Sequence, residues 1–266
     1  MLAIDTLIKG YRFIKRYIFK YPLYVCKYSL ARFVSKYKTN IQFYSDKDFF
    51  DAVSSGKSII RLGDGEIGLL HGRDIHYQKH SKALEQDIRT IIHSYTVDSP
   101  YILCIPLFVN YSNKELRMLG PGKLSCWLPL KVEANSICNK KIAYADPHFS
   151  YDRQKMLTFF KASLYGKKIV FVTNKENINE IEKIKNIFDD ALCIETKSEN
   201  AFETKAEIIA AIENSLKNKT GYILVVACGP LSKSLVYHFS NKNIQSYDIG
   251  FGLRYLWDTA DYSHRI

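Results

Sequence analysis

The sequence lacks the features that mark several common protein classes. Its six cysteines are scattered and form no CxxC pair. This pattern argues against a structural zinc site or a disulfide framework, and it favours a reducing compartment. No internal repeat and no low-complexity tract is present, and neither composition nor repetition suggests a disordered or solenoid protein. We therefore expect a compact protein of the cytoplasm.

Long apolar runs are missing from the first 40 residues, where charges recur every few positions. The segment cannot supply the ~20 apolar residues of a membrane-spanning helix, and it has no apolar stretch with a cleavage site like that of a signal peptide. It interleaves nine Lys and Arg residues with tyrosines and phenylalanines. Such a helix suits the surface of an anionic membrane. A solvated helix that packs its rings on the rest of the protein is the alternative.

Net charge is scarce in the rest of the chain. The total is +11, and residues 1–40 account for +8 of it, which leaves +3 on the remaining 226 residues. A basic surface for nucleic acid requires clustered cations on the folded body, so we expect no nucleic-acid partner. With 47% hydrophobic and 14% aromatic residues, the chain is able to pack a substantial core. We expect a helical segment over residues 1–40 and one catalytic domain over residues 41–266.

Apolar segments typical of strands alternate with segments of helical spacing along most of the chain. Alternating strands and helices predict a Rossmann-like α/β fold with a mostly parallel, doubly wound sheet. The predicted strands are 58–62, 101–105, 141–145, 168–173, 191–195, 222–227 and 246–249, and the predicted helices are 46–53, 84–95, 178–188, 205–216 and 232–239, with another helix between Pro147 and Ser163.

A segment rich in glycine and acid follows the first of these strands. Residues 63–68 satisfy GxGxxG, which would bind a pyrophosphate in a dinucleotide site. However, Asp64 and Glu66 would place two carboxylates beside that anion, and like charges repel. In extended backbone, residues i and i+2 point to the same side, so the two carboxylates would converge on one Mn²⁺ or Mg²⁺ ion. The alternative is a turn in which Glu66 caps the next helix.

A second candidate for phosphate binding follows the strand 222–227. Gly229 and Pro230 form a turn into a helix whose first residues include Ser232 and Lys233. The amide groups of a helix start, with a hydroxyl and an ammonium, are suited to an anion. The alternative is an ordinary strand-to-helix loop in which Ser232 caps the helix.

A histidine stands at another predicted strand end, directly after Asp146 and Pro147. His148 is a candidate general base, although a lone histidine is more often structural. The other histidines show no spacing typical of metal ligands.

Together these segments resemble the GT-D-fold glycosyltransferases, a family first catalogued as a domain of unknown function. Residues 61–66 (Arg-Leu-Gly-Asp-Gly-Glu) resemble the family's R-[FY]-G-D-G-E segment, residues 229–233 its G-P helix start, and residues 247–250 its D-I-G strand end. The similarity extends over residues 45–255 in unchanged order. It implies transfer of a sugar from a nucleoside-diphosphate sugar, a UDP-sugar first of all, to a glycan, glycolipid or glycoprotein.

The resemblance also implies roles for individual residues. Asp64 and Glu66 match the family's metal motif, while Asp248 joins the catalytic group. Donor-binding positions are Arg61, Gly63, Gly65, Gly229, Pro230, Ser232 and Lys233. One departure stands out, because Phe251 occupies the position where the family commonly has a histidine. A nucleotide-binding Rossmann-type regulatory or scaffold protein without transferase activity is therefore the alternative function.

Overall fold

The computed structural model describes residues 40–119, 130, 131, 134 and 137–257. The helical leader expected over residues 1–40 therefore lies almost wholly outside the described part, as does its expected membrane contact. The chain divides into two compact units, and the larger consists of residues 41–107 and 137–266. The described residues contain no helix that is both long and apolar enough to span a membrane.

The larger unit is built on a parallel sheet of six strands in the order β3-β2-β8-β7-β5-β6. Every pairing within this sheet is parallel, which confirms the predicted doubly wound α/β fold. The strands are β2 (Ser58–Arg61), β3 (Tyr101–Cys104), β5 (Lys168–Thr173), β6 (Asp190–Glu195), β7 (Tyr222–Ala227) and β8 (Ser246–Asp248).

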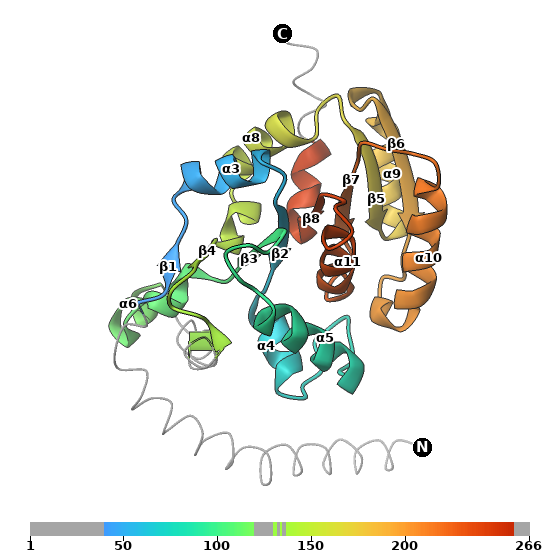
Figure 1. The fold of residues 1–266 in the computed structure, drawn as a ribbon. Coiled ribbons are helices and arrows are strands. Elements are labelled where there is room, and N and C mark those ends of the chain that lie inside the picture. Colours follow the sequence, from blue (N-terminus) through green and yellow to red (C-terminus); the bar gives the residue numbers. More distant parts are fainter. Residues whose placement is uncertain (1–39, 120–129, 132–133, 135–136, 258–266) are drawn as a thin grey trace, which may run out of the picture. The chain divides into compact units, whose positions relative to one another are not determined.

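Helices cover both faces of this sheet (Figure 1). Helices α4, α5, α10 and α11 pack against one another on one face, while α3, α8 and α9 enclose a core with the other. Their bounds are α3 (Asp46–Ser54), α4 (Asp64–Leu70), α5 (Lys82–His93), α8 (Arg153–Ser163), α9 (Lys175–Lys183), α10 (Lys205–Leu216) and α11 (Leu231–Ser240). Short 3-10 helices complete the unit: η3 (Pro147–Tyr151), η4 (Lys185–Ile187), η5 (Ala201–Thr204) and η6 (Gly250–Leu256).

The strands are apolar on both sides because each side meets a layer of helices. Ile59 of β2 and Val225 of β7 belong to the core beneath α3 and α8. Their chain neighbours Ile60 and Leu224 point to the opposite face, since side chains alternate along a strand. All four side chains are almost completely buried. Burial of an aliphatic side chain of this size contributes roughly 1.5–3 kcal/mol.

Local signals in the sequence set most of the helix starts. The sequence offers Ser45 or Asp46 as the cap of α3, and in the structure it is Ser45, which accepts a hydrogen bond from the Asp48 amide at 3.2 Å. The helix predicted over 178–188 begins earlier, because the Asn174 side chain accepts from the Asn177 amide and caps α9 at Lys175. It also ends earlier, at Lys183, and η4 follows.

A small second sheet flanks the carboxyl end of β3. The strand predicted over 141–145 is shorter in the structure, where β4 (Ala143–Tyr144) pairs in parallel with β1 (Gln42–Phe43). Ala145 then bridges to Cys104 at the end of β3. The strand β1 was not predicted, because two residues carry no periodic signal.

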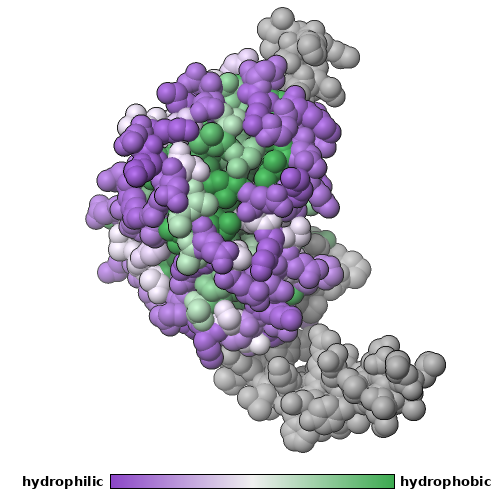
Figure 2. All heavy atoms as spheres, turned by 90° about the vertical axis from the view of Figure 1, so that its right-hand side faces the viewer, coloured by the Kyte–Doolittle hydropathy of each residue, from purple (hydrophilic) through white to green (hydrophobic). Residues whose placement is uncertain are grey.

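Strand β6 is the open edge of the six-stranded sheet. Its middle residues, from Ala191 to Cys193, are only partly buried. Figure 2 views the molecule from the side that bears this strand, and it shows a hydrophobic band bordered by hydrophilic residues. An exposed strand edge offers unpaired backbone groups to other chains.

The described part of the smaller unit contains the end of η2 (Leu107–Asn110) and the helix α6 (Asn113–Met118). Ser112 and Glu115 form a capping box at the start of α6, in which each side chain accepts from the other residue's amide. The buried Lys131 donates to the Tyr111 carbonyl at 2.6 Å. Burial lowers the pKa of Lys131, and nearby Glu115 partly offsets that effect. The sequence around Trp127 also predicts a helix, and that segment lies outside the described residues.

Candidate functional site

The site forms where three segments meet at the carboxyl edge of the sheet. Strand β8 lies between β2 and β7, so the ends of these strands bring together Arg61, Asp248 and the loop that enters α11. The carboxyl ends of parallel strands are where open α/β sheets bind ligands. The sequence-predicted segments at residues 61–66, 229–233 and 247–250 are therefore neighbours in space.

A buried lysine links these segments. The Lys233 ammonium lies 3.0 Å from Glu66 Oε1 and 3.2 Å from Asp248 Oδ2, and it donates to the Gly229 carbonyl at 3.3 Å. The side chains of Lys233 and Glu66 are only 7% and 8% exposed. We call the four charged residues Arg61, Glu66, Lys233 and Asp248 the ion cluster.

Arg61 holds the other side of Asp248. Its Nε donates to the Asp248 carbonyl at 2.8 Å, and its Nη2 lies 3.5 Å from Asp248 Oδ1. The backbone amide of Arg61 also donates to Asp248 Oδ2 at 3.3 Å. Its remaining nitrogen, Nη1, donates to the Ser150 hydroxyl. The Arg61 side chain therefore fixes the strand end instead of projecting toward a ligand.

The charges of the ion cluster balance one another. Burial alone would lower the pKa of Lys233, but the carboxylates of Asp248 and Glu66 outweigh it, so the pKa is raised above its ordinary value. The lysine is therefore charged at neutral pH. Two cations face two carboxylates. A buried cluster of this kind is stable only when each charge has a partner of opposite sign.

The glycine-acid segment is helical, so the prediction of extended backbone was wrong. Helix α4 begins at Asp64, and Glu66 caps it by accepting from the Gly63 amide at 2.8 Å. Two residues apart in a helix point about 200° apart, so Asp64 and Glu66 do not share one direction. Asp64 is exposed and accepts from the Gly65 amide at 3.0 Å.

The described residues contain no group of three or more His, Cys, Asp or Glu side chains arranged to hold a metal ion. Both carboxylate oxygens of Glu66 already have partners, one on Lys233 and one on the Gly63 amide. The exposed Asp64 carboxylate is the accessible hard oxygen ligand. Mg²⁺ is commonly held by one or two carboxylates together with phosphate oxygens and water, and in the described site Asp64 is a carboxylate that would be open to such an ion.

The second predicted segment forms a tight turn into α11. Gly229 adopts a left-handed conformation with φ +64°, and Pro230 is the N-cap of the helix. Ser232 is fully buried, and its hydroxyl accepts from the Cys228 amide at 3.0 Å. The Ser232 hydroxyl thus stabilises the turn and does not face the solvent side of the site.

Two glycines allow side chains to approach the backbone closely. A Cβ on Gly250 would lie 1.9 Å from Arg61 Nη2, and a Cβ on Gly229 would lie 2.8 Å from the ring of Tyr77. Both glycines also have positive φ angles, where other residues are strained. The glycines are needed for this packing, since the guanidinium and the ring fill the space beside their Cα atoms.

His148 lies in η3, two residues before the Ser150 that contacts Arg61. Its Nδ1 is 2.7 Å from Asp146 Oδ1, an arrangement that orients the imidazole ring. The side chain of His148 is 31% exposed. It is therefore at the edge of the site and not within the ion cluster.

Sequence reasoning missed two members of the site. Ser150 stands 89 residues from the Arg61 that it binds, and Tyr77 lies in the loop after α4. Burial raises the pKa of Tyr77, and Glu66 raises it further, which places the phenol near the ion cluster. No motif marks Ser150. Tyr77 is the aromatic position of residues 72–78, which resemble a G-x-x-I-x-[FY]-Q stretch of the same family, but nothing in the sequence assigned that position a role.

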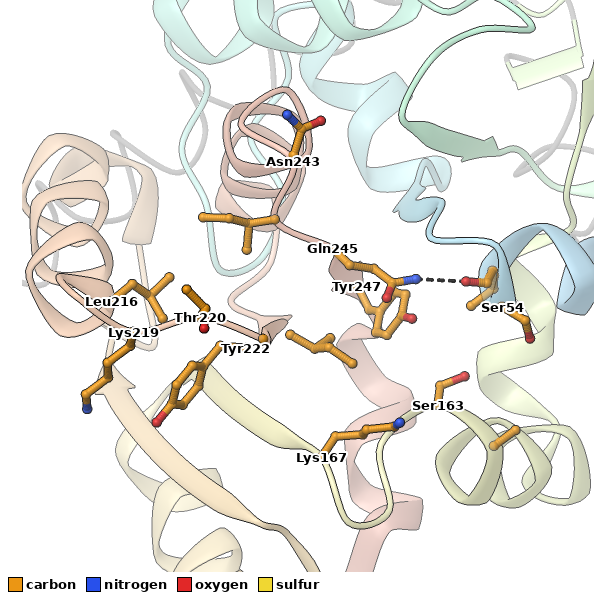
Figure 3. A pocket seen from close by; sticks show the side chains of 15 residues that line it. Ser54, Ser163, Lys167, Leu216, Lys219, Thr220, Tyr222, Asn243, Gln245 and Tyr247 are labelled. Atoms are coloured by element: carbon orange, nitrogen blue, oxygen red, sulfur yellow. Dashed lines mark hydrogen bonds between the residues drawn. The ribbon is translucent and has the colours of Figure 1, made fainter.

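The described residues of the larger unit also form a hollow of about 680 Å³ at the opposite end of the sheet. Figure 3 shows Lys167, Tyr222 and Gln245, which lie at the amino ends of β5, β7 and β8. Gln245 donates to the Val53 carbonyl at 2.8 Å. No set of opposed charges converges there, so the carboxyl edge is the better candidate.

Comparisons with known proteins agree on the fold. A family model described as "Glycosyltransferase GT-D fold" matches residues 59–258. A selenomethionine-substituted structure of domain of unknown function 1792 has a TM-score of 0.69 at 20% identity, covering 88% of this chain and 86% of that chain. The same values hold for a structure described as that domain with a distinct glycosyltransferase fold.

A further solved structure, described as a new glycosyltransferase from Streptococcus sanguinis, has a TM-score of 0.67 at 22% identity. The similarity covers 85% of this chain and 87% of that chain. No curated protein matches. At these identities the solved structures show a shared fold, and the family model extends that agreement to the sequence.

Proposed function

Because this chain belongs to the family of glycosyltransferases with the GT-D fold, we propose that it transfers a sugar from a nucleoside-diphosphate sugar in a metal-dependent reaction. The donor that we expect first is a UDP-sugar, and the acceptor is a glycan, glycolipid or glycoprotein of the cell surface. The reaction would take place at the carboxyl edge of the sheet, around the ion cluster and Asp64.

The charge balance of the site supports the metal. Arg61 and Lys233 are already neutralised by Glu66 and Asp248, and Asp64 adds an exposed negative charge. The described site therefore offers no surplus positive charge to a diphosphate. A divalent cation on Asp64 would supply that charge and neutralise the departing diphosphate.

The residues of this chain then divide into two roles. Asp64 would hold the metal, and the turn at Gly229 and Pro230, at the positive end of the α11 helix dipole, would lie beside the phosphates. Asp248 and Arg61 are buried and bind each other, so we assign them to positioning and not to contact with substrate.

His148 remains the candidate general base. Its imidazole is oriented by Asp146 and partly exposed at the edge of the site. A base in this position would accept the proton of an acceptor hydroxyl. To test this role, the rate of sugar transfer would be measured against pH in the unaltered protein and in a His148→Gln protein. A base at this position predicts that the two pH profiles differ.

We also propose that residues 1–40 hold the enzyme at the membrane surface. Lipid-linked acceptors lie at the inner face of the membrane, and a basic, Tyr-rich segment would hold the enzyme at that anionic surface. Binding to vesicles with and without anionic lipid, by the full chain and by a chain lacking residues 1–39, measures this contribution. Equal binding of both chains would contradict it.

The central experiment measures both binding and turnover. Titration calorimetry with UDP, with and without Mn²⁺, reports the nucleotide site, and release of UDP from a panel of UDP-sugars reports transfer or hydrolysis. We expect both signals to fall at least tenfold in EDTA and to return when Mn²⁺ is restored. Binding and turnover that are unchanged in EDTA and in a folded Asp64→Ala protein would refute the proposal.

A nucleotide-binding protein without transferase activity is the second candidate. It is favoured by Phe251, which stands where the resembled family commonly has a histidine. The same titration separates the two functions. Metal-dependent UDP binding with no UDP release from any donor would support the second candidate.

A further inference from the structure

Exposed aromatic rings gather around the ion cluster. Seven large hydrophobic side chains are exposed among the described residues, and Tyr77, Tyr151 and Phe251 are three of them, at 45%, 56% and 53% exposure. Tyr151 follows the Ser150 that binds Arg61. Phe251 follows Gly250, whose Cα faces the same guanidinium. These rings therefore border the proposed reaction site.

Two of them belong to a row of four planar groups. The ring centroids of His148 and Tyr151 are 5.7 Å apart, and those of Tyr151 and Phe251 are 5.9 Å apart with an interplanar angle of 29°. The guanidinium carbon of Arg254 lies 3.7 Å from the Phe251 centroid. We call His148, Tyr151, Phe251 and Arg254 the aromatic row.

Contacts with nearby residues of the same loops fix this row. Tyr255 donates from its hydroxyl to the Tyr151 carbonyl at 3.2 Å, and it accepts from Arg254 Nη2 at 2.8 Å. A Cβ on Gly252 would lie 3.0 Å from the Ser150 carbonyl, a tight contact. The loop that carries Phe251 is thus held against the loop that carries Tyr151, and the row is preformed.

The spacing of the row excludes a flat ring between its members. A third ring between two others requires about 7 Å, twice the carbon–carbon contact distance, whereas Tyr151 and Phe251 are 5.9 Å apart. The guanidinium of Arg254 lies over the ring of Phe251. The exposed parts of the row combine aromatic surface with a phenol, an imidazole and guanidinium N–H groups.

We propose that the aromatic row binds a sugar ring of the acceptor. A pyranose presents C–H groups and hydroxyls side by side, and the row offers exposed aromatic surface beside hydrogen-bonding groups. A nucleobase needs an open aromatic face to stack on, and the interior of the row offers none. This inference rests on the proposed transferase function, because it assigns the acceptor side of the same site.

The inference is also specific to this chain. Phe251 occupies the position of a histidine in the resembled family, and it stacks with both Tyr151 and Arg254. The substitution therefore places a wholly apolar ring in the row. We expect the identity of residue 251 to affect which acceptors are used, and to leave nucleotide binding unchanged.

Saturation-transfer NMR tests the row without requiring turnover. The probes are UDP and a panel of methyl glycosides of glucose, galactose, N-acetylglucosamine and rhamnose, measured with the full chain in the presence of diamagnetic Mg²⁺. Phe251→Leu and Tyr151→Leu remove a ring and keep apolar bulk. Tyr165→Leu is the matched control, because Tyr165 is 62% exposed and follows the far end of α8.

We expect at least one glycoside to bind the unaltered protein and to lose about tenfold in affinity in both row variants. UDP binding should be unchanged in all three variants, and Tyr165→Leu should retain glycoside binding. The inference is overturned if no glycoside binds, if the row variants bind as the unaltered protein does, or if they lose UDP instead. Glycoside binding without any UDP release from donors would refute the transferase function and leave the row intact.

Discussion

The ammonium of Lys233 lies 3.2 Å from the Oδ2 atom of Asp248, and both side chains are withdrawn from solvent. One residue belongs to α11 and the other ends β8, so their ion pair ties a helix to the strand beside it. The same ammonium reaches Glu66 at the start of α4. A single side chain therefore connects three elements at the proposed site.

Replacement of Lys233 by Met should destabilise the protein strongly. The change leaves Glu66 and Asp248 buried with one counter-ion fewer, and breaking a buried pair in this way costs about 3–5 kcal/mol. Urea unfolding at neutral pH measures the loss. The double variant Lys233→Met, Glu66→Gln should recover part of that stability, because it removes one of the two stranded charges.

Lys242→Met is the control for that series. Lys242 pairs with Glu213 at the surface, where its side chain is 50% exposed, and such pairs contribute about 1 kcal/mol or less. Equal losses of stability in Lys233→Met and Lys242→Met would show that the ion cluster is not a buried unit.

Asp64→Asn and Glu66→Gln should differ in what they disturb. Asp64 is exposed, so its amide variant should keep the free energy of unfolding within about 0.5 kcal/mol while losing metal-dependent UDP binding. Glu66→Gln weakens the contact with Lys233 and the cap on Gly63, and we expect a loss of about 1–3 kcal/mol. Calorimetry measures UDP binding and urea unfolding measures stability in both proteins. A clear loss of stability in the Asp64→Asn protein would contradict the role of Asp64 as a metal ligand with no structural part.

Alanine at the two close-packed glycines should have unequal costs. At Gly250 the new Cβ meets a guanidinium that Asp248 and Ser150 hold in place. At Gly229 it meets the ring of Tyr77, which is 45% exposed and free to turn away. Both variants carry about 1–2 kcal/mol of left-handed backbone strain, so only Gly250→Ala should exceed that range in thermal or urea unfolding.

A double variant isolates the steric part. Adding Tyr77→Ala to Gly229→Ala removes the ring, so the cost that remains should be the backbone strain alone. Little recovery relative to the sum of the single variants is therefore expected, and a clear recovery would show that the ring opposes the new methyl group instead of turning away.

Stability in acid should depend on Glu85. His80, Lys82 and Arg89 all bind its carboxylate, with His80 having the largest effect, and together they lower the pKa of Glu85 to about 2 from an ordinary 4.5. A carboxyl whose pKa is lowered by folding stabilises the protein above its unfolded pKa and loses that effect as pH falls through the folded pKa. Glu85→Gln should therefore cost about 1 kcal/mol near pH 7.

The same difference should shrink as the pH is lowered from about 4.5 toward about 2. Urea unfolding of both proteins near pH 7 and near pH 3 supplies the comparison. Glu176→Gln, on the exposed first turn of α9, is the control. A Glu85→Gln effect that stays constant with pH would assign its cost to packing instead of charge.

Strand and helix order followed well from local patterns in this chain, since β5, β7 and α10 have the predicted bounds. The geometry of the site followed less well. Asp64 and Glu66 are two positions apart in the sequence whether the backbone is extended or helical, so their separation does not predict the conformation. In the structure the segment is helical, with Glu66 bonded to the Gly63 amide at the start of the helix.

Other contacts in the site could not be predicted from the sequence, because they depend on the order of the strands in the sheet. Lys233 reaches Asp248 only because β8 lies between β2 and β7, and the order of parallel strands is not written in local periodicity. Ser150 reaches Arg61 from a separate 3-10 helix for the same reason. Contacts of this kind depend on the assembled sheet.

The open strand β6 has a consequence for behaviour at high concentration. If two copies joined these edges antiparallel and centred on each other, Asp190 of one copy would oppose Glu195 of the other at both ends of the new ladder. Like charges directly opposite each other destabilise a strand pair. The acidic ends of β6 therefore resist edge-to-edge aggregation, even though the middle of the strand presents apolar side chains to a crowded solution.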